Sequence, residues 1–198
     1  MTRNVVLILF LLGFPLLSNA TLTLSFTGGT LFGLNTESPL ADGSLVIAVT
    51  TSNSSFSGPV DGSFVSGGDT VIGSWTVDSG VDGPGTFDVT FENISYGAGI
   101  DYGQKIALYW FSSISSIESL PNQGDAYGFY SDSSWLIPAD GSLLVTYTIS
   151  TIANGGSLSD SSTVANMVVS AVPEPAAYAG LVGVAALGVV AWRRRRAV

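Results

Sequence analysis

Apolar and polar residues alternate along several stretches of this chain, and an alternation of period two is typical of half-buried β-strands. In residues 21–27, Leu22, Leu24 and Phe26 fall on one face, and threonines and a serine fall on the other. The same pattern predicts four more strands, at 44–51, 70–77, 86–92 and 142–150. The side chains expected to point inward are Val71, Trp75 and Val77 in the strand at 70–77, Phe87, Val89 and Phe91 in the strand at 86–92, and Leu143, Val145, Tyr147 and Ile149 in the strand at 142–150. The chain is therefore expected to be built from β-sheets.

Residues 105–111 differ from the other predicted strands because they are apolar on both faces, so they are expected at the centre of a sheet that is covered twice. Turn-forming pairs lie between the strands, at Asp42-Gly43, Asp61-Gly62, Asp82-Gly83, Asp140-Gly141 and Asn154-Gly155. No long amphipathic helix is indicated, and residues 114–120 fit a helical turn or a loop. The fold class that follows is all-β, an antiparallel β-sandwich or a jelly-roll-like barrel of about eight to ten strands.

The first twenty residues have the three parts of a secretory signal peptide. Arg3 gives a positive start, residues 5–17 are uncharged and mostly apolar, and Ser18 and Ala20 are small residues at the end. As a helix with a rise of about 1.5 Å per residue, the apolar run reaches about 20 Å, which is short of the roughly 30 Å hydrocarbon layer. We expect cleavage after Ala20, so that the mature chain begins at Thr21.

The opposite end of the chain carries a second apolar segment. Val172, Pro173, Glu174 and Pro175 precede the uncharged residues 176–192, and Arg193, Arg194, Arg195 and Arg196 follow them. An apolar run of about 17 residues is the shortest that spans a membrane as a helix. The arginines are expected to stop transfer and to stay in the cytoplasm, which leaves the preceding domain outside. The prolines disfavour helix before them, so the segment next to the bilayer is expected to be extended.

This order of parts resembles the PEP-CTERM sorting tail of Gram-negative bacteria, which is also catalogued as the C-terminal domain of certain ice-binding proteins. The likeness rests on the Pro-Glu-Pro motif, the short uncharged helix and the arginine cluster, and it covers residues 172–198. The resemblance implies recognition by an exosortase, an integral membrane cysteine transpeptidase. It also implies a transient stay in the inner membrane, removal of the tail, and transfer to the cell envelope, the surface or an exopolysaccharide matrix.

These assignments divide the chain into a signal peptide at 1–20, an ectodomain at 21–171 and a sorting tail at 172–198. Residues 21–172 hold 14 carboxylates and a single cation, Lys105, for a formal charge of −13. Such a charge disfavours nucleic acid and anionic lipid as partners of the ectodomain. The whole chain has no histidine and no cysteine, which excludes disulfides, thiol nucleophiles, a histidine general base and metal ligation by those residues.

Carboxylates are the only abundant catalytic residue type, so a glycosidase with two acids is the enzyme hypothesis to weigh. Such pairs lie roughly 5–9.5 Å apart, whereas Asp88 and Glu92 on one strand face are expected about 13 Å apart. Calcium binding would use acids without a recognisable loop motif, namely Asp61, Asp69, Asp78, Asp82, Asp132 and Asp140. Solubility and turn formation are simpler roles for these acids. We expect no catalytic residue, no metal and no cofactor.

Aromatic residues leave a binding function open, because they form either a core or a sugar-stacking platform. The relevant residues are Trp75, Tyr102, Tyr109, Trp110, Tyr127, Phe129, Tyr130 and Trp135. The sequence as a whole predicts an exported, non-enzymatic protein of the cell surface or extracellular matrix. The alternatives are a surface carbohydrate-binding module and, further off, a carboxylate glycosidase.

Overall fold

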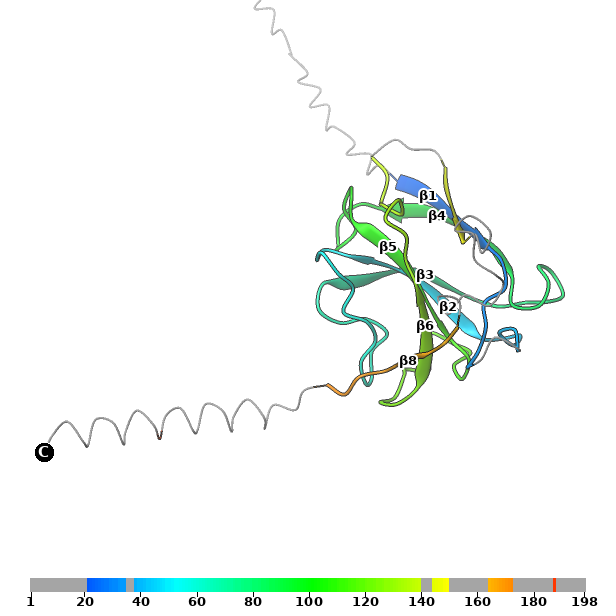
Figure 1. The fold of residues 1–198 in the computed structure, drawn as a ribbon. Coiled ribbons are helices and arrows are strands. Elements are labelled where there is room, and N and C mark those ends of the chain that lie inside the picture. The colour runs from blue at the N-terminus through cyan, green and yellow to red at the C-terminus, as the bar shows by residue number, and fades with distance from the viewer. Residues whose placement is uncertain (1–20, 35–37, 140–143, 150–163, 173–186, 188–198) are drawn as a thin grey trace, which may run out of the picture.

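The computed structural model describes residues 21–34, 38–139, 144–149, 164–172 and 187 (Figure 1). The described residues do not include the predicted signal peptide at 1–20. They also leave out Pro173, Glu174 and Pro175, the predicted helix at 176–192 apart from Leu187, and the arginine cluster at 193–196. In the described part of the chain, no helix has the length and the apolar character that a membrane span requires. The structure therefore concerns the predicted ectodomain.

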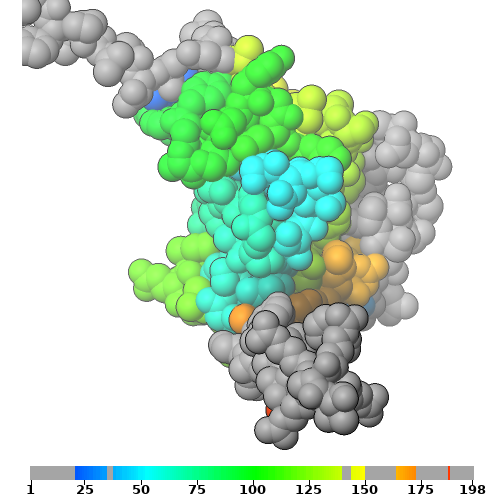
Figure 2. Space-filling view, turned by 90° about the vertical axis from the view of Figure 1, so that its left-hand side faces the viewer, coloured from blue at the N-terminus to red at the C-terminus, as the bar shows by residue number. Residues whose placement is uncertain are grey.

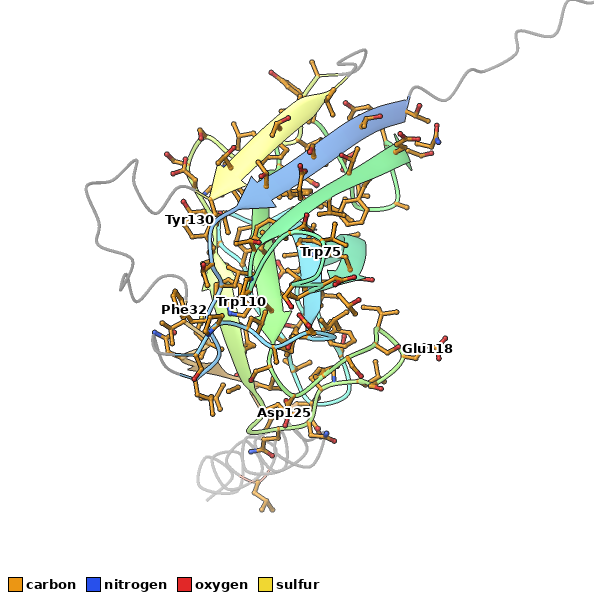
Figure 3. All side chains as sticks on the ribbon, turned by 90° about the vertical axis from the view of Figure 1, so that its right-hand side faces the viewer. Phe32, Trp75, Trp110, Glu118, Asp125 and Tyr130 are labelled. Carbon is orange, nitrogen blue, oxygen red and sulfur yellow. The ribbon has the colours of Figure 1, made fainter. Side chains whose placement is uncertain are left out.

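Two β-sheets make up this domain. In chain order the strands are β1 (Thr21–Gly28), β2 (Leu45–Thr51), β3 (Asp69–Thr76), β4 (Phe87–Ser95), β5 (Lys105–Phe111), β6 (Ala126–Tyr130), β7 (Val145–Ile149) and β8 (Met167–Val168). One sheet has the order β4-β1-β7, which Figure 3 shows as a single layer, and the other has the order β3-β2-β5-β6-β8. The sheets pack as a sandwich, which confirms the predicted fold class.

One strand pair departs from the antiparallel arrangement. The five-stranded sheet is antiparallel throughout, and so is the β1–β4 pair, but β7 runs parallel to β1. Parallel neighbours need a long connection because the chain must return to the same end of the sheet. Here the connection between β1 and β7 contains β4 and most of the second sheet.

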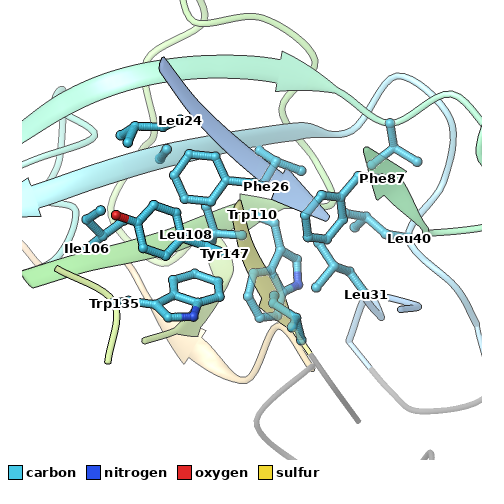
Figure 4. Close-up of a cluster of buried hydrophobic side chains, with 14 of the residues drawn as sticks. Leu24, Phe26, Leu31, Leu40, Phe87, Ile106, Leu108, Trp110, Trp135 and Tyr147 are labelled. Atoms are coloured by element: carbon cyan, nitrogen blue, oxygen red, sulfur yellow. The ribbon is translucent and has the colours of Figure 1, made fainter. Parts of the chain in front are cut away.

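The inner core lies between the two sheets (Figure 4). Leu22, Leu24 and Phe26 of β1 are fully buried in it, as the alternation predicts. The ring of Phe26 stacks on Tyr147 of β7 with 5.3 Å between centroids and meets Trp135 edge-on at 6.0 Å. Further inward side chains come from β4 and β5, and those of Phe87, Val89 and Phe91 confirm the predicted inward face of β4.

Strand β5 contributes to two cores. Ile106, Leu108 and Trp110 face the inner core, while Ala107, Tyr109 and Phe111 face an outer core on the other side of the sheet. All six side chains have no exposed surface. The prediction that residues 105–111 form a central strand covered on both faces is therefore confirmed.

The predicted inward face of β3 is only partly correct. Trp75 and Val77 join the inner core, but Val71 packs against the outer core. The pairing of β3 with β2 shifts by one residue: Ala48 lies opposite Gly73, but the next residue, Val49, lies opposite Val71. Ile72 is therefore the extra residue of a β-bulge. A bulge exchanges the two faces of a strand, so strict alternation places Val71 on the wrong side.

The predicted turns are confirmed where the structure describes them. Gly43, Gly62 and Gly83 have φ values of 78°, 75° and 95°, a left-handed region that favours glycine. Val60 and Ser63, which flank Asp61-Gly62, pair with each other through two backbone hydrogen bonds of 2.9 Å, so this pair forms a tight turn within the loop between β2 and β3. Asp42-Gly43 and Asp82-Gly83 instead lie between strands of different sheets. The pairs Asp140-Gly141 and Asn154-Gly155 lie outside the described residues.

Trp110 is the largest fully buried side chain. Its cross-strand partner on β6 is Gly128, and a Cβ atom there would overlap the indole ring. Figure 3 shows Trp110 close to Phe32, whose carbonyl oxygen accepts a hydrogen bond from the indole nitrogen at 3.0 Å. The missing side chain at position 128 thus makes room for the indole against the sheet.

We predict that Gly128→Ala destabilises the domain by about 3 kcal/mol, because a fully packed core cannot absorb the added methyl group. The matched control is Gly33→Ala, where the nearest atom to a new Cβ, Ser112 Cβ, lies 3.8 Å away. The control should change stability by less than about 0.5 kcal/mol. Urea unfolding of the purified protein measures both values, and equal stabilities of the two variants would contradict the packing described here.

Candidate functional site

A long loop, residues 52–68, covers the outer face of the five-stranded sheet. Figure 2 shows this loop in cyan on one side of the molecule, between a green region around residue 100 and the orange segment 164–172. Phe64 is buried against Phe111 of β5, with 5.3 Å between ring centroids. The loop therefore closes the outer core in the way that the second sheet closes the inner one.

Asp69, the first residue of β3, fastens this loop to the sheet. Its Oδ2 atom accepts hydrogen bonds from the backbone nitrogens of Ser57 at 2.8 Å and Gly58 at 3.1 Å. The hydroxyl of Tyr109 donates to the same oxygen at 3.3 Å. Asp69 is the one buried acid among the described residues, and its other oxygen, Oδ1, has no hydrogen-bond partner among those residues. A buried carboxylate held in this way fixes the loop because its release would leave the charge unpaired.

The two tyrosines beside Asp69 stay neutral. Burial, followed by the negative charge of Asp69, raises the pKa of Tyr109 far above its usual value. The pKa of Tyr127 is raised by the same two causes in the same order. Both phenols are therefore protonated at physiological pH, so their hydroxyl groups can donate hydrogen bonds.

A cavity of about 500 Å³ opens between the loop and the sheet, and we call it the outer groove. Its volume lies within the range of small-molecule sites. The lining comes from the loop, from β5, β6 and β8, and from the turn after β6. It comprises Ser54, Ser55, Phe56, Ser57, Gly58, Lys105, Tyr109, Tyr127, Phe129, Ser131, Asp132, Ser133 and Met167.

The aromatic part of the outer groove is held by mutual ring contacts. Phe56 meets Phe129 edge-on with 5.7 Å between centroids, and it meets Tyr109 edge-on at 6.4 Å. Phe56 and Phe129 are half-buried, whereas Tyr109 and Tyr127 are buried. The phenylalanines thus retain accessible ring surface, and the tyrosines form the support beneath them.

Polar groups complete the outer groove. Lys105, the only cation of residues 21–172, is exposed at the start of β5, and its Nζ atom donates to the carbonyl oxygen of Ser54 at 2.8 Å. Asp132 accepts hydrogen bonds from the backbone nitrogen of Ser134 at 2.8 Å and from its hydroxyl at 2.7 Å. These bonds, the side-chain bond first, lower the pKa of Asp132. The groove therefore combines a fixed carboxylate, an ammonium and serine hydroxyls with aromatic rings.

This combination suits a ligand that has apolar faces and many hydroxyl groups. Aromatic rings stack on the apolar faces of such a ligand, and the serines, Lys105 and Asp132 offer donors and acceptors at the rim. Two other acids that the sequence singled out accept hydrogen bonds from the backbone of loops. Asp61 Oδ1 accepts from the backbone nitrogen of Gln123 at 3.0 Å, and Asp78 Oδ1 accepts from that of Gly80 at 3.0 Å.

The acids weighed for calcium or glycosidase chemistry lie at separate places. Asp88 and Glu92 are both exposed on β4, and Asp82 lies in the turn before that strand. Among the described residues, no group of three or more acids is arranged to hold a metal ion. Asp140 lies outside those residues.

Most of the aromatic residues in question belong to the core. Tyr109, Trp110, Tyr127 and Trp135 are buried, Trp75, Phe129 and Tyr130 are half-buried, and Tyr102 is exposed.

Sequence reasoning missed the outer groove because Phe56 lies in a serine-rich loop without strand periodicity. The available signal was the pair of apolar residues Phe56 and Phe64 in that loop, since β5 needs a cover on both faces.

The predicted processing sites lie at the two described ends of the domain. Thr21 is the exposed first residue of β1, and Val172 is the exposed last residue of the described segment 164–172. Residues 171–196 match the PEP-CTERM protein-sorting motif. No curated protein and no solved structure matches the chain. The chain therefore carries a PEP-CTERM protein-sorting motif, which implies an exported protein that is processed by an exosortase and sorted to the cell surface.

Proposed function

We propose that this protein is a non-enzymatic component of the cell surface or extracellular matrix. It is exported through its signal peptide, held in the inner membrane by residues 176–192, and released when an exosortase-like transpeptidase removes the sorting tail. The observation that carries this proposal is the match of residues 171–196 to the sorting motif, with the four arginines as its final residues.

The composition of the domain supports a role in water outside the cell. A formal charge of −13 over residues 21–172 keeps a sheet protein soluble and discourages edge-to-edge association. The absence of histidine and cysteine removes the commonest general base and the most reactive nucleophile. Asp42, Asp61, Asp78 and Asp132 each accept hydrogen bonds from loop residues, which supports a structural role for these acids.

We predict that changing Arg193, Arg194, Arg195 and Arg196 together to glutamine impairs membrane retention and tail removal. The reason is that neutral residues no longer stop transfer at the cytoplasmic face. Pulse labelling followed by fractionation measures how fast the full-length precursor shortens and where it resides. The rate of shortening should fall severalfold.

The control for this experiment changes the same four arginines to lysine. Lysine keeps the positive charge, so the lysine variant should mature close to the normal rate. If the glutamine variant also matured normally, the arginine cluster would have no part in stop-transfer.

A second candidate function is saccharide binding in the outer groove. The observation that favours it is the convergence of the half-buried rings of Phe56 and Phe129 with serine hydroxyls, Lys105 and Asp132 around one cavity. Saccharides present apolar ring faces and dense hydroxyl groups, which match these two kinds of lining. Retention in a polysaccharide matrix would then depend on the folded domain as well as on the tail.

We predict that Phe129→Ala weakens binding to the best saccharide on a glycan array by about tenfold, as expected for the loss of an aromatic contact worth about 1.5 kcal/mol. The matched control is Phe91→Ala on β4, which removes an equally half-buried phenylalanine that packs against the inner core. The array is probed with the processed protein. Equal loss of binding in both variants would indicate general destabilisation, and no binding by the unmodified protein would eliminate this candidate.

A further inference from the structure

The segment just before the sorting motif is built into the domain. The backbone nitrogen of Ala165 donates to Gly33 O at 2.8 Å, and that of Val169 donates to Asp125 O at 2.9 Å. Asp61 in turn donates from its backbone nitrogen to Ser170 O at 2.8 Å. Between these anchors β8 pairs with β6. The chain is therefore fixed by hydrogen bonds as far as Ser170.

Burial strengthens this attachment. Ala165 belongs to the inner core and Val169 to the outer core, with 1% and 3% of their surfaces exposed. Ala171 and Val172, in contrast, are exposed. The folded domain thus ends at Ser170, next to the residues that match the sorting motif.

Covalent geometry limits how far the domain can lie from the membrane. Five residues, 171–175, separate Ser170 from the uncharged segment that begins at Ala176. Even fully extended, five residues span no more than about 18 Å. The polar headgroup region takes up about 5–8 Å of this length. The end of the domain that holds Ser170 must therefore lie close to the membrane surface while the tail is attached.

The surface around this point consists of two loops, which we call the exit face: residues 59–63 and 121–125. The backbone nitrogen of Gly62 donates to Pro121 O at 2.8 Å, and that of Gln123 donates to Asp61 Oδ1 at 3.0 Å. The backbone nitrogen of Asn122 also donates to Asp125 Oδ2 at 2.8 Å. The loops are bonded to each other and to residues 164–170, which we call the exit segment, so the exit face is a preformed surface.

Exposed apolar side chains occur in the segments that form this surface and in those that precede or follow them in the chain. Of the large hydrophobic residues that are exposed in the described chain, five lie in these segments: Ile117, Leu120, Met167, Val168 and Val172. The acids Asp61 and Glu118 are exposed there as well. Carboxylates are repelled by an anionic lipid surface. A protein partner at the membrane therefore fits this mixture of apolar and acidic groups better than lipid does.

We propose that the exit face docks directly on the exosortase during processing, so that the enzyme recognises the folded end of the domain as well as the linear motif. This inference rests on the proposed function, because it concerns the same processing event. Only Ala171 and Val172 stand between Ser170 and Pro173, so an enzyme that binds the motif lies close to the exit face. Apolar residues beside the exit segment supply the contact area.

Site-specific photo-crosslinking tests this proposal on the full chain in cells that also produce an epitope-tagged exosortase. A benzophenone amino acid replaces Gln123, an exposed residue of the exit face. The matched control replaces Tyr102, which is 72% exposed in the loop before β5, at the opposite end of the sheet from the β6–β8 pairing. Crosslinks to exosortase should be at least about fivefold more abundant at position 123, because the short tether concentrates that face at the enzyme.

A second variant separates docking from sequence recognition. A flexible linker of about ten glycine and serine residues is inserted between Ser170 and Ala171, which frees the motif from the folded domain. Crosslinking at position 123 should fall severalfold and tail removal should slow. Normal tail removal without a crosslink at position 123, equal crosslinks at both positions, or crosslinks to lipid alone would overturn the docking proposal. Failure to remove the tail from the unmodified chain would overturn the proposed function itself.

Discussion

Residues 106–111 of strand β5 are fully buried on both faces, and the architecture around the strand follows from this. Its even-numbered residues require the three-stranded sheet as a cover, and its odd-numbered residues require a second cover on the outer side. Residues 52–68 and Val169 provide that second cover. Because a loop cannot fill a sheet face as evenly as another sheet would, a cavity remains between the loop and β5, β6 and the following turn. The candidate ligand site is thus a consequence of how the outer core is closed.

Much of this fold could be predicted from periodicity, because period-two patterns report directly on which face of a strand is buried. The strands at Thr21–Gly28 and Lys105–Phe111 illustrate this, since the predicted inward residues Leu22, Leu24 and Phe26 and all of residues 106–111 are buried, although Ser25 on the polar face of β1 is buried as well. Periodicity fails where backbone geometry changes the register, as at Ile72, and it says nothing about which distant strands pair. The parallel pairing of β7 with β1 therefore had no local signal.

The candidate site was less accessible to sequence reasoning than the fold. Asp69 looks like any other acid near a turn, and only the structure shows that it is buried and binds the backbone of Ser57 and Gly58. Phe56 lies in a serine-rich loop and becomes informative once β5 is known to need two covers. The sorting tail is the opposite case, because its meaning depends on the order of a short motif, an apolar run and a basic cluster. That order is fully written in the sequence.

The central claim is that the hydrophobic ends direct the chain to its destination and are removed, while the acidic domain remains in water. Intact-mass spectrometry of the protein recovered from the cell surface or the culture medium tests this claim most directly. The account predicts a species that begins at Thr21 and lacks Arg193, Arg194, Arg195 and Arg196. Exported material that still ends in the four arginines would contradict it.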